Sequence, residues 1–147
     1  MFKSLKAFAL SLSFFCFAFL SNGQTAYGAP EPIEYLLATI NAGTYVQRDD
    51  ITVKRFRSLL DQLSQKYVED EQQIADMTVK IIEILKEKGI SEKPLAIMEG
   101  MNSLFHSNAG LRYVEYVSTY VTLRDSGKSH EAAVIGLRML LRALGVR

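Results

Sequence analysis

The chain has 147 residues, with 17 basic and 16 acidic side chains, two histidines and one cysteine. This length limits the chain to one domain, and a net charge of +1 gives no concentrated basic surface of the kind that nucleic acid requires. A single cysteine, Cys16, also excludes an internal disulfide framework.

Residues 1–28 have the order of regions that is typical of a secretory signal peptide. Lys3 and Lys6 supply a basic start, and the uncharged apolar run Ala7–Leu20 follows. This run is shorter than the roughly 20 residues that a membrane-spanning helix needs. Ala26 and Gly28 are small residues at the two positions that a signal peptidase reads, so we predict cleavage after Gly28. Cleavage after Gly23 is the alternative.

Removal of this leader leaves residues 29–147 as a single helical domain. Loss of Lys3 and Lys6 reduces the 17 basic residues to 15 against 16 acidic ones, which gives a net charge of −1. Loss of Cys16 leaves no cysteine, so burial of apolar side chains must stabilise the fold. Export without disulfides favours a bacterial periplasm, with secretion as the other destination. We expect no membrane span after cleavage and no nucleic-acid partner.

The periodicity of apolar residues after Pro32 is helical throughout, with no run of period two. It predicts an all-α fold, a compact bundle of five to six short helices. Residues with oxygen-bearing side chains precede several of these segments and are expected to cap them. The capping residues are Asp49 or Asp50, Asp70 with Gln73, Ser91 and Ser129. The expected helices span residues 32–42, 51–68, 71–88, 92–106, 110–125 and 130–144.

The segment 130–144 is apolar on nearly all sides and keeps only a narrow charged strip. A helix with this pattern is normally covered by neighbours on several sides. We therefore predict that it is the central helix of the bundle. The competing interpretation places its second apolar face in the interface of a homodimer, and the mass of the protein in solution distinguishes the two.

The segment 110–125 carries Tyr113, Tyr116 and Tyr120 on one flank of its apolar half, with three valines on the other flank. A tyrosine at the edge of a core buries its ring and keeps its hydroxyl in water, which requires no ligand. The functional alternative is a tyrosine-lined groove for a peptide or a partner helix. Burial at the core edge is the preferred interpretation, and Tyr113, Tyr116 and Tyr120 are the candidate partner-binding residues.

Neither histidine has the spacing of a metal site. His106 lies on the polar side of its helix, seven residues after Glu99, and His130 begins the last helix beside Glu131. No His-Glu-x-x-His pattern and no third ligand accompany them. We therefore expect no metal and no cofactor.

Acidic residues are the remaining candidates for catalysis. The cluster Glu69, Asp70 and Glu71 precedes a helix, where capping and the helix dipole account for the negative charge. A hydrolase that used scattered carboxylates would draw on the least explained acids, which are Glu99, Glu115 and Glu131. The sequence has no Gly-x-Ser-x-Gly elbow and no phosphate-loop spacing. We predict no catalytic residues.

These observations favour an exported, non-enzymatic helical protein that binds another protein or a peptide, as an inhibitor, an adaptor or a small chaperone. The alternative is a carrier of a small apolar ligand in the bundle interior, because methionines can line such a cavity, although they more often fill core gaps. The methionines concerned are Met77, Met98, Met101 and Met139. The hydrolase is the third possibility.

Overall fold

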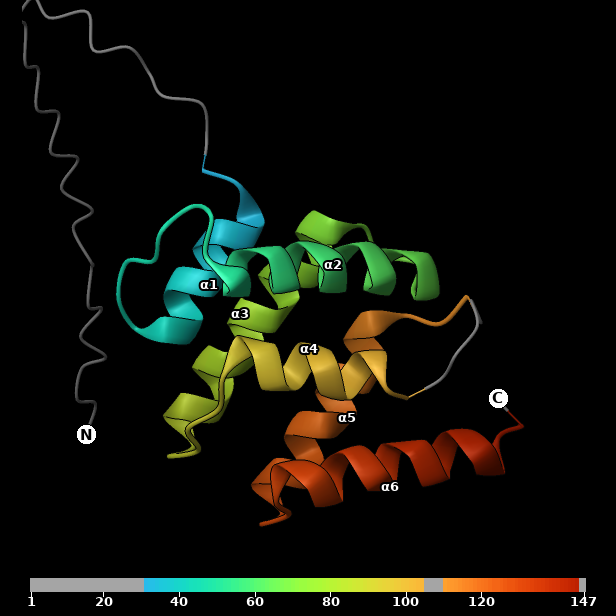
Figure 1. Cartoon of the computed structure of the whole chain (residues 1–147). Coiled ribbons are helices and arrows are strands. Elements are labelled where there is room, and N and C mark those ends of the chain that lie inside the picture. The colour runs from blue at the N-terminus through green and yellow to red at the C-terminus, as the bar shows by residue number, and fades with distance from the viewer. Residues whose placement is uncertain (1–30, 105–109, 146–147) are drawn as a thin grey trace, which may run out of the picture.

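In a computed structural model, residues 31–104 and 110–145 are described, and this part of the chain contains six α-helices and no β-strand. The all-α prediction is confirmed. The predicted signal peptide lies outside the described residues and stays a prediction. The helices, coloured in chain order in Figure 1, are α1 (Ile33–Ala42), α2 (Ile51–Lys66), α3 (Glu71–Glu87), α4 (Pro94–Asn102), α5 (Tyr113–Asp125) and α6 (His130–Ala143).

Three of the predicted helix caps are confirmed by hydrogen bonds. Asp50 accepts from the backbone N–H of Thr52 at 2.7 Å. Asp70 and Gln73 form a reciprocal capping box at the start of α3. Ser129 accepts from the N–H of residue 132 at 3.2 Å and caps α6.

The predicted start of the fourth helix is wrong. Ser91 does not cap it, because the helix begins at Pro94 after Lys93, whose side chain makes no capping bond. The physical reason is the proline ring, which disfavours helical geometry in the residue before it. Lys93 is accordingly extended, with φ −107° and ψ 144°.

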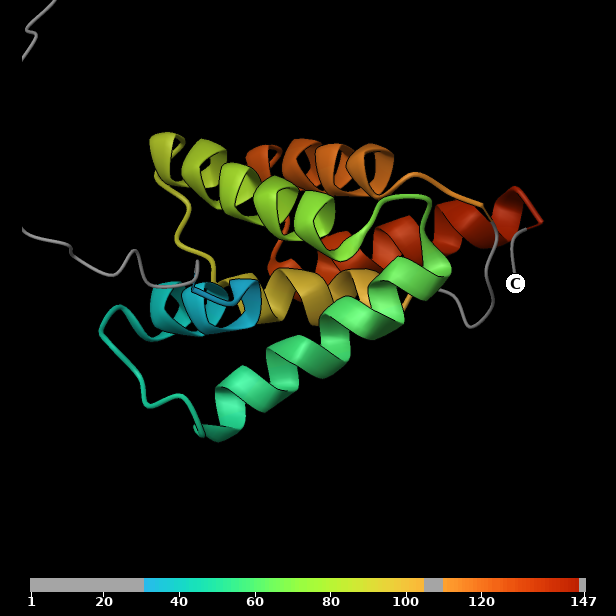
Figure 2. The ribbon, with the colours of Figure 1, turned by 90° about the horizontal axis from the view of Figure 1, so that it is seen from above.

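The core is a single cluster to which all six helices contribute. Figure 1 shows α2, α4 and α6 stacked one below another, with α3 and α5 crossing behind them, and Figure 2 shows α3 and α5 side by side from above. Among the described helices, none is both long and apolar enough to cross a membrane. The largest fully buried side chains include Phe56, Leu60, Leu63, Ile74, Leu85, Ile97, Met98, Met101, Tyr113 and Tyr120.

Helix α6 lies at the edge of the bundle, so the prediction that it is the central helix is wrong. It packs against α4 and α5 alone among the described helices, and Figure 1 shows it as the outermost helix. Its inner face is buried through Ala133, Val134, Leu137 and Leu141. The outer apolar residues remain exposed, with exposed fractions of 53% for Ile135 and 66% for Met139.

Helices α4 and α6 come close together at Gly100. This residue is buried in α4, and a Cβ atom built on it would lie 2.8 Å from Cγ2 of Val134 and 3.3 Å from Cε1 of His130. Val134 and His130 both belong to α6. The absence of a side chain at position 100 is therefore what allows α6 to pack against α4.

We expect Gly100→Ala to destabilise the protein by about 1–2 kcal/mol, because the cost of overpacking exceeds the gain in helix propensity. Gly136→Ala is the matched control, since its Cβ would make an ordinary contact of 3.5 Å with Leu123. That variant should gain about 0.5–1 kcal/mol. Urea unfolding of both variants measures the difference. If Gly100→Ala were as stable as Gly136→Ala, α6 would be able to move away from α4 without loss of stability.

Candidate interaction site

The three tyrosines of α5 lie in different environments. Tyr113 and Tyr120 have exposed fractions of 0% and are part of the core, whereas Tyr116 is partly buried and packs against the core. The ring of Tyr67 meets Tyr113 edge-on, with 5.1 Å between ring centroids, and Tyr116 at 6.1 Å. The expectation that these hydroxyls stay in water is therefore wrong for Tyr113 and Tyr120, which are fully buried.

The hydrogen bonds of Thr78 determine the direction of the hydrogen bond made by the buried Tyr113 hydroxyl. It lies 2.9 Å from Oγ1 of Thr78, whose own proton goes to the carbonyl of Ile74 at 2.8 Å. Tyr113 must therefore donate to Thr78. Burial raises the pKa of Tyr113 well above its ordinary value of 10.0. The hydroxyl thus remains a hydrogen-bond donor at physiological pH and holds α5 against α3.

An open apolar groove runs between α3 and α5, on the flank of α5 away from Tyr116. Its volume is about 330 Å³. Met77, Ile84 and Val114 are partly exposed in its lining. We call this site the α3–α5 groove, and it is lined by Asp76, Met77, Lys80, Ile81, Ile84, Val114, Val117 and Ser118.

The α3 rim of the groove carries charges of both signs. Asp76 and Lys80 lie one helical turn apart on α3, and both are exposed. Ser118 adds a hydroxyl from α5. An apolar floor with a polar rim of both signs suits an amphipathic segment of a protein.

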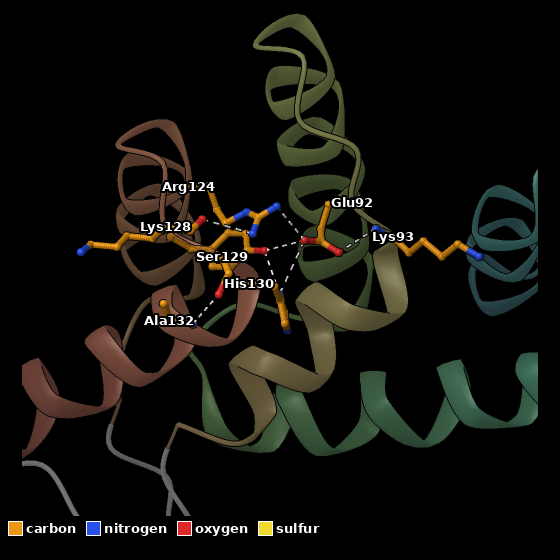
Figure 3. Close-up of polar contacts among 8 residues, drawn as sticks. Glu92, Lys93, Arg124, Lys128, Ser129, His130 and Ala132 are labelled. Atoms are coloured by element: carbon orange, nitrogen blue, oxygen red, sulfur yellow. Dashed lines mark hydrogen bonds and ion pairs between the residues drawn. The ribbon is translucent and has the colours of Figure 1, made fainter.

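A partly buried polar cluster joins three parts of the chain at the other end of α5. Glu92 lies in the loop before α4, Tyr120 and Arg124 belong to α5, and His130 begins α6. Oε2 of Glu92 accepts from the Tyr120 hydroxyl at 3.1 Å, forms an ion pair with Arg124 at 3.2 Å, and lies 3.7 Å from Nδ1 of His130. Figure 3 shows Glu92, Arg124 and His130 pointing toward one another from these separate elements. We call these four residues the Glu92 cluster.

A count of hydrogens assigns the protonation of His130. The Tyr120 hydroxyl lies 2.8 Å from Nδ1 of His130 as well as 3.1 Å from Glu92, yet it has one proton to donate. A carboxylate only accepts, so that proton goes to Glu92. Nδ1 of His130 must then carry a hydrogen and donate to the Tyr120 oxygen. The chain of donors therefore runs from His130 through Tyr120 to Glu92.

The side chains of the Glu92 cluster are largely shielded from water. The side chains of Glu92 and Arg124 are each 12% exposed, and Arg124 also donates to the carbonyl of Lys128 at 3.3 Å. Burial, followed by the charge of Glu92, raises the pKa of Tyr120 well above 10.0. The cluster therefore anchors the first turn of α6 to α5 and to the loop before α4.

Glu69 has a structural role that its position in the sequence conceals. Its side chain is 5% exposed and accepts from the backbone N–H of Tyr113 at 2.7 Å. This N–H is among those left unpaired at the start of α5, so Glu69 caps α5 from a distance. The capping and dipole explanation for the acidic cluster holds for Asp70, but Glu69 serves α5 and not α3.

Comparison with protein families identifies the family of this chain. Residues 37–140, which include parts of all six helices, match the MoxZ family. The chain belongs to the MoxZ family. No curated protein and no solved structure matched this chain.

The acidic residues that sequence reasoning left unexplained lie apart in this MoxZ family member. Glu99 forms an ion pair with Arg55 of α2. Glu115 is exposed in the first turn of α5, and Glu131 is exposed in the first turn of α6. Among the described residues, no three His, Cys, Asp or Glu side chains are grouped so that they could hold a metal ion. His106 lies outside the described residues.

The four methionines do not surround one space. Met98 and Met101 are fully buried in the core, Met77 lines the α3–α5 groove, and Met139 is exposed on α6. Sequence reasoning missed both the groove and the Glu92 cluster. It assigned Val114 and Val117 to the flank opposite the tyrosines, but nothing local indicates that α3 leaves this flank partly open.

Proposed function

We propose that this MoxZ family member is an exported protein that binds an apolar segment of another protein in the α3–α5 groove. The proposal includes export, which the basic and apolar regions of residues 1–28 favour. The groove is the observation that carries the proposal, because Met77, Ile84 and Val114 expose apolar surface there between two helices. Tyr113, Tyr116 and Tyr120 stay a predicted binding set, and the two buried ones act by holding α5 in place.

The shape of the groove favours a helical segment as its occupant. Two packed helices present a trough in which a third helix can lie, and an apolar stripe of the ligand would contact Ile84 and Val114. The rim charges Asp76 and Lys80 would fix the direction of the ligand. An inhibitor, an adaptor and a chaperone all act through such contacts.

Site-specific photo-crosslinking in native cells tests this proposal. A benzoylphenylalanine residue at position 114 lies in the groove, whereas one at position 122 lies exposed on the same helix. We expect a discrete crosslinked product from position 114 and none from position 122. Equal products from both positions would contradict the proposal.

Charge substitution in the groove gives the quantitative test on the crosslinked partner. Val114→Lys places a charge among apolar contacts and should weaken binding at least about tenfold. Thr122→Lys adds the same charge on the exposed face of α5 and should leave the affinity unchanged. Circular dichroism confirms that both variants fold. Full affinity of the Val114→Lys variant would refute binding in the groove.

A small apolar ligand is the second candidate occupant, because the groove volume of about 330 Å³ falls within the usual range for small-molecule sites. Native mass spectrometry of the protein purified from its own cells separates the two. A bound mass of a few hundred daltons that is lost in Val114→Lys would favour the carrier. The bare chain mass would favour the protein partner.

A further inference from the structure

The outer face of α6 is an unpartnered apolar surface at the edge of the bundle. The large side chains on this face, Ile135 and Met139, have exposed fractions of 53% and 66%. Ala132 and Ala143 are exposed beside them. Among the described helices, α4 and α5 alone contact α6, and both lie on its opposite face.

A charged border runs along one side of this face. At 100° per residue, Glu131, Arg138 and Arg142 lie within roughly 40° of one another. The acidic residue stands in the first turn of the helix, and Arg142 stands in the last. Within the described part of the chain Arg142 forms no ion pair, whereas Arg138 donates to Ser103 at 3.0 Å.

The charged borders of two copies of α6 are complementary when the two helices pack antiparallel. A two-fold axis perpendicular to α6 places the charged borders of two copies on the same side, with their residue order reversed. If the axis passes between positions 136 and 137, Glu131 of each copy lies opposite Arg142 of the other. A parallel pair would leave these residues a whole helix length apart.

We propose that two copies of this chain associate through α6, as an antiparallel helix pair about a two-fold axis. Ile135 and Met139 form the centre of the interface, and two symmetric Glu131–Arg142 pairs flank it. The small residues Ala132 and Ala143 let the helices approach closely. A patch of one helix per copy is below the standard interface size, so the dimer should be weak, with a dissociation constant in the range of about 1–100 µM. This inference is independent of the α3–α5 groove.

Sedimentation equilibrium of the protein from cells that express the whole chain tests the dimer, over about 1–500 µM to bracket the expected constant. We expect the mass to rise from monomer to dimer with concentration. Met139→Asp should weaken association at least about tenfold, and the exposure of Met139 allows the fold to tolerate it. Asp76→Ala, on a different surface, should leave the constant unchanged.

Charge exchange tests the antiparallel arrangement. Glu131→Arg and Arg142→Glu should each weaken self-association about tenfold, because each puts like charges opposite one another twice. The double variant that carries both substitutions should recover the self-association of the unmodified protein. An equimolar mixture of the two single variants should form a mixed dimer. A strict monomer at all concentrations would overturn the proposal, as would a dimer indifferent to these exchanges. Binding of a different protein by a strictly monomeric chain, lost in Met139→Asp, would assign the face to that protein and also overturn it.

Discussion

Tyr113→Ala should lower the free energy of unfolding by about 3–5 kcal/mol, a large fraction of the stability of a domain of this size. The ring is fully buried and contacts Tyr67, the residue that follows α2, edge-on at 5.1 Å, so its removal opens a cavity between Tyr67 and α5. Tyr113→Phe should cost only about 1 kcal/mol, because Thr78 keeps its bond to the Ile74 carbonyl. Urea unfolding followed by circular dichroism measures both values.

Tyr116 provides the matched control for this prediction. It lies on the same helix one turn away but is only partly buried, so Tyr116→Ala should cost about 1–2 kcal/mol. The comparison shows how much of the stability depends on full burial of the Tyr113 ring. If Tyr113→Ala proved as mild as Tyr116→Ala, the placement of α5 against α3 and Tyr67 would be wrong.

Local signals explain what the sequence could predict of the fold. The stripe of α2 contains Val53, Phe56, Leu60 and Leu63, and all of these residues are buried. Asp70 and Gln73 are three residues apart, so their capping box requires no tertiary information. Such features depend on spacing within one helix, and a single sequence contains that spacing.

The environment of α6 required information that spacing does not contain. Its apolar residues cover most of its circumference, and this pattern is the same for a helix buried in its own chain and for one with a free outer face. The side on which Val134 is buried depends on the close approach at Gly100, which lies in another helix. Position in the bundle therefore could not follow from hydrophobicity alone.

The candidate sites were hidden for the same reason. Glu92 and His130 are 38 positions apart, and each alone resembles an ordinary loop acid or a residue at a helix start. Helix α5 carries apolar residues on both sides of its buried face, so its sequence indicated two flanks without showing which one stays open. Tertiary packing made Tyr113 a core residue and left Val114 in the α3–α5 groove.

The Glu92 cluster leads to the second large expected effect, which is a loss of about 2–4 kcal/mol in Glu92→Ala. This substitution removes the acceptor of the Tyr120 hydroxyl and the ion-pair partner of Arg124, whose side chain is only 12% exposed. Glu92→Gln keeps an acceptor oxygen but loses the charge, so its loss of stability should lie between zero and the loss in Glu92→Ala. Glu83→Ala, at an exposed position on α3, should change stability by less than about 0.5 kcal/mol.

The protonation of His130 gives a readout that general destabilisation would not produce. With Glu92 present, the Tyr120 proton goes to the carboxylate, and the neutral imidazole must carry its hydrogen on Nδ1. In Glu92→Ala the tyrosine proton is free to turn toward Nδ1, so the hydrogen of the ring should move to Nε2. Nitrogen-15 NMR of the assigned His130 ring, recorded with the imidazole neutral, distinguishes the two tautomers. An Nε2-protonated ring in the unmodified protein would show that Tyr120 donates to His130, and that Glu92 holds α6 through Arg124 alone.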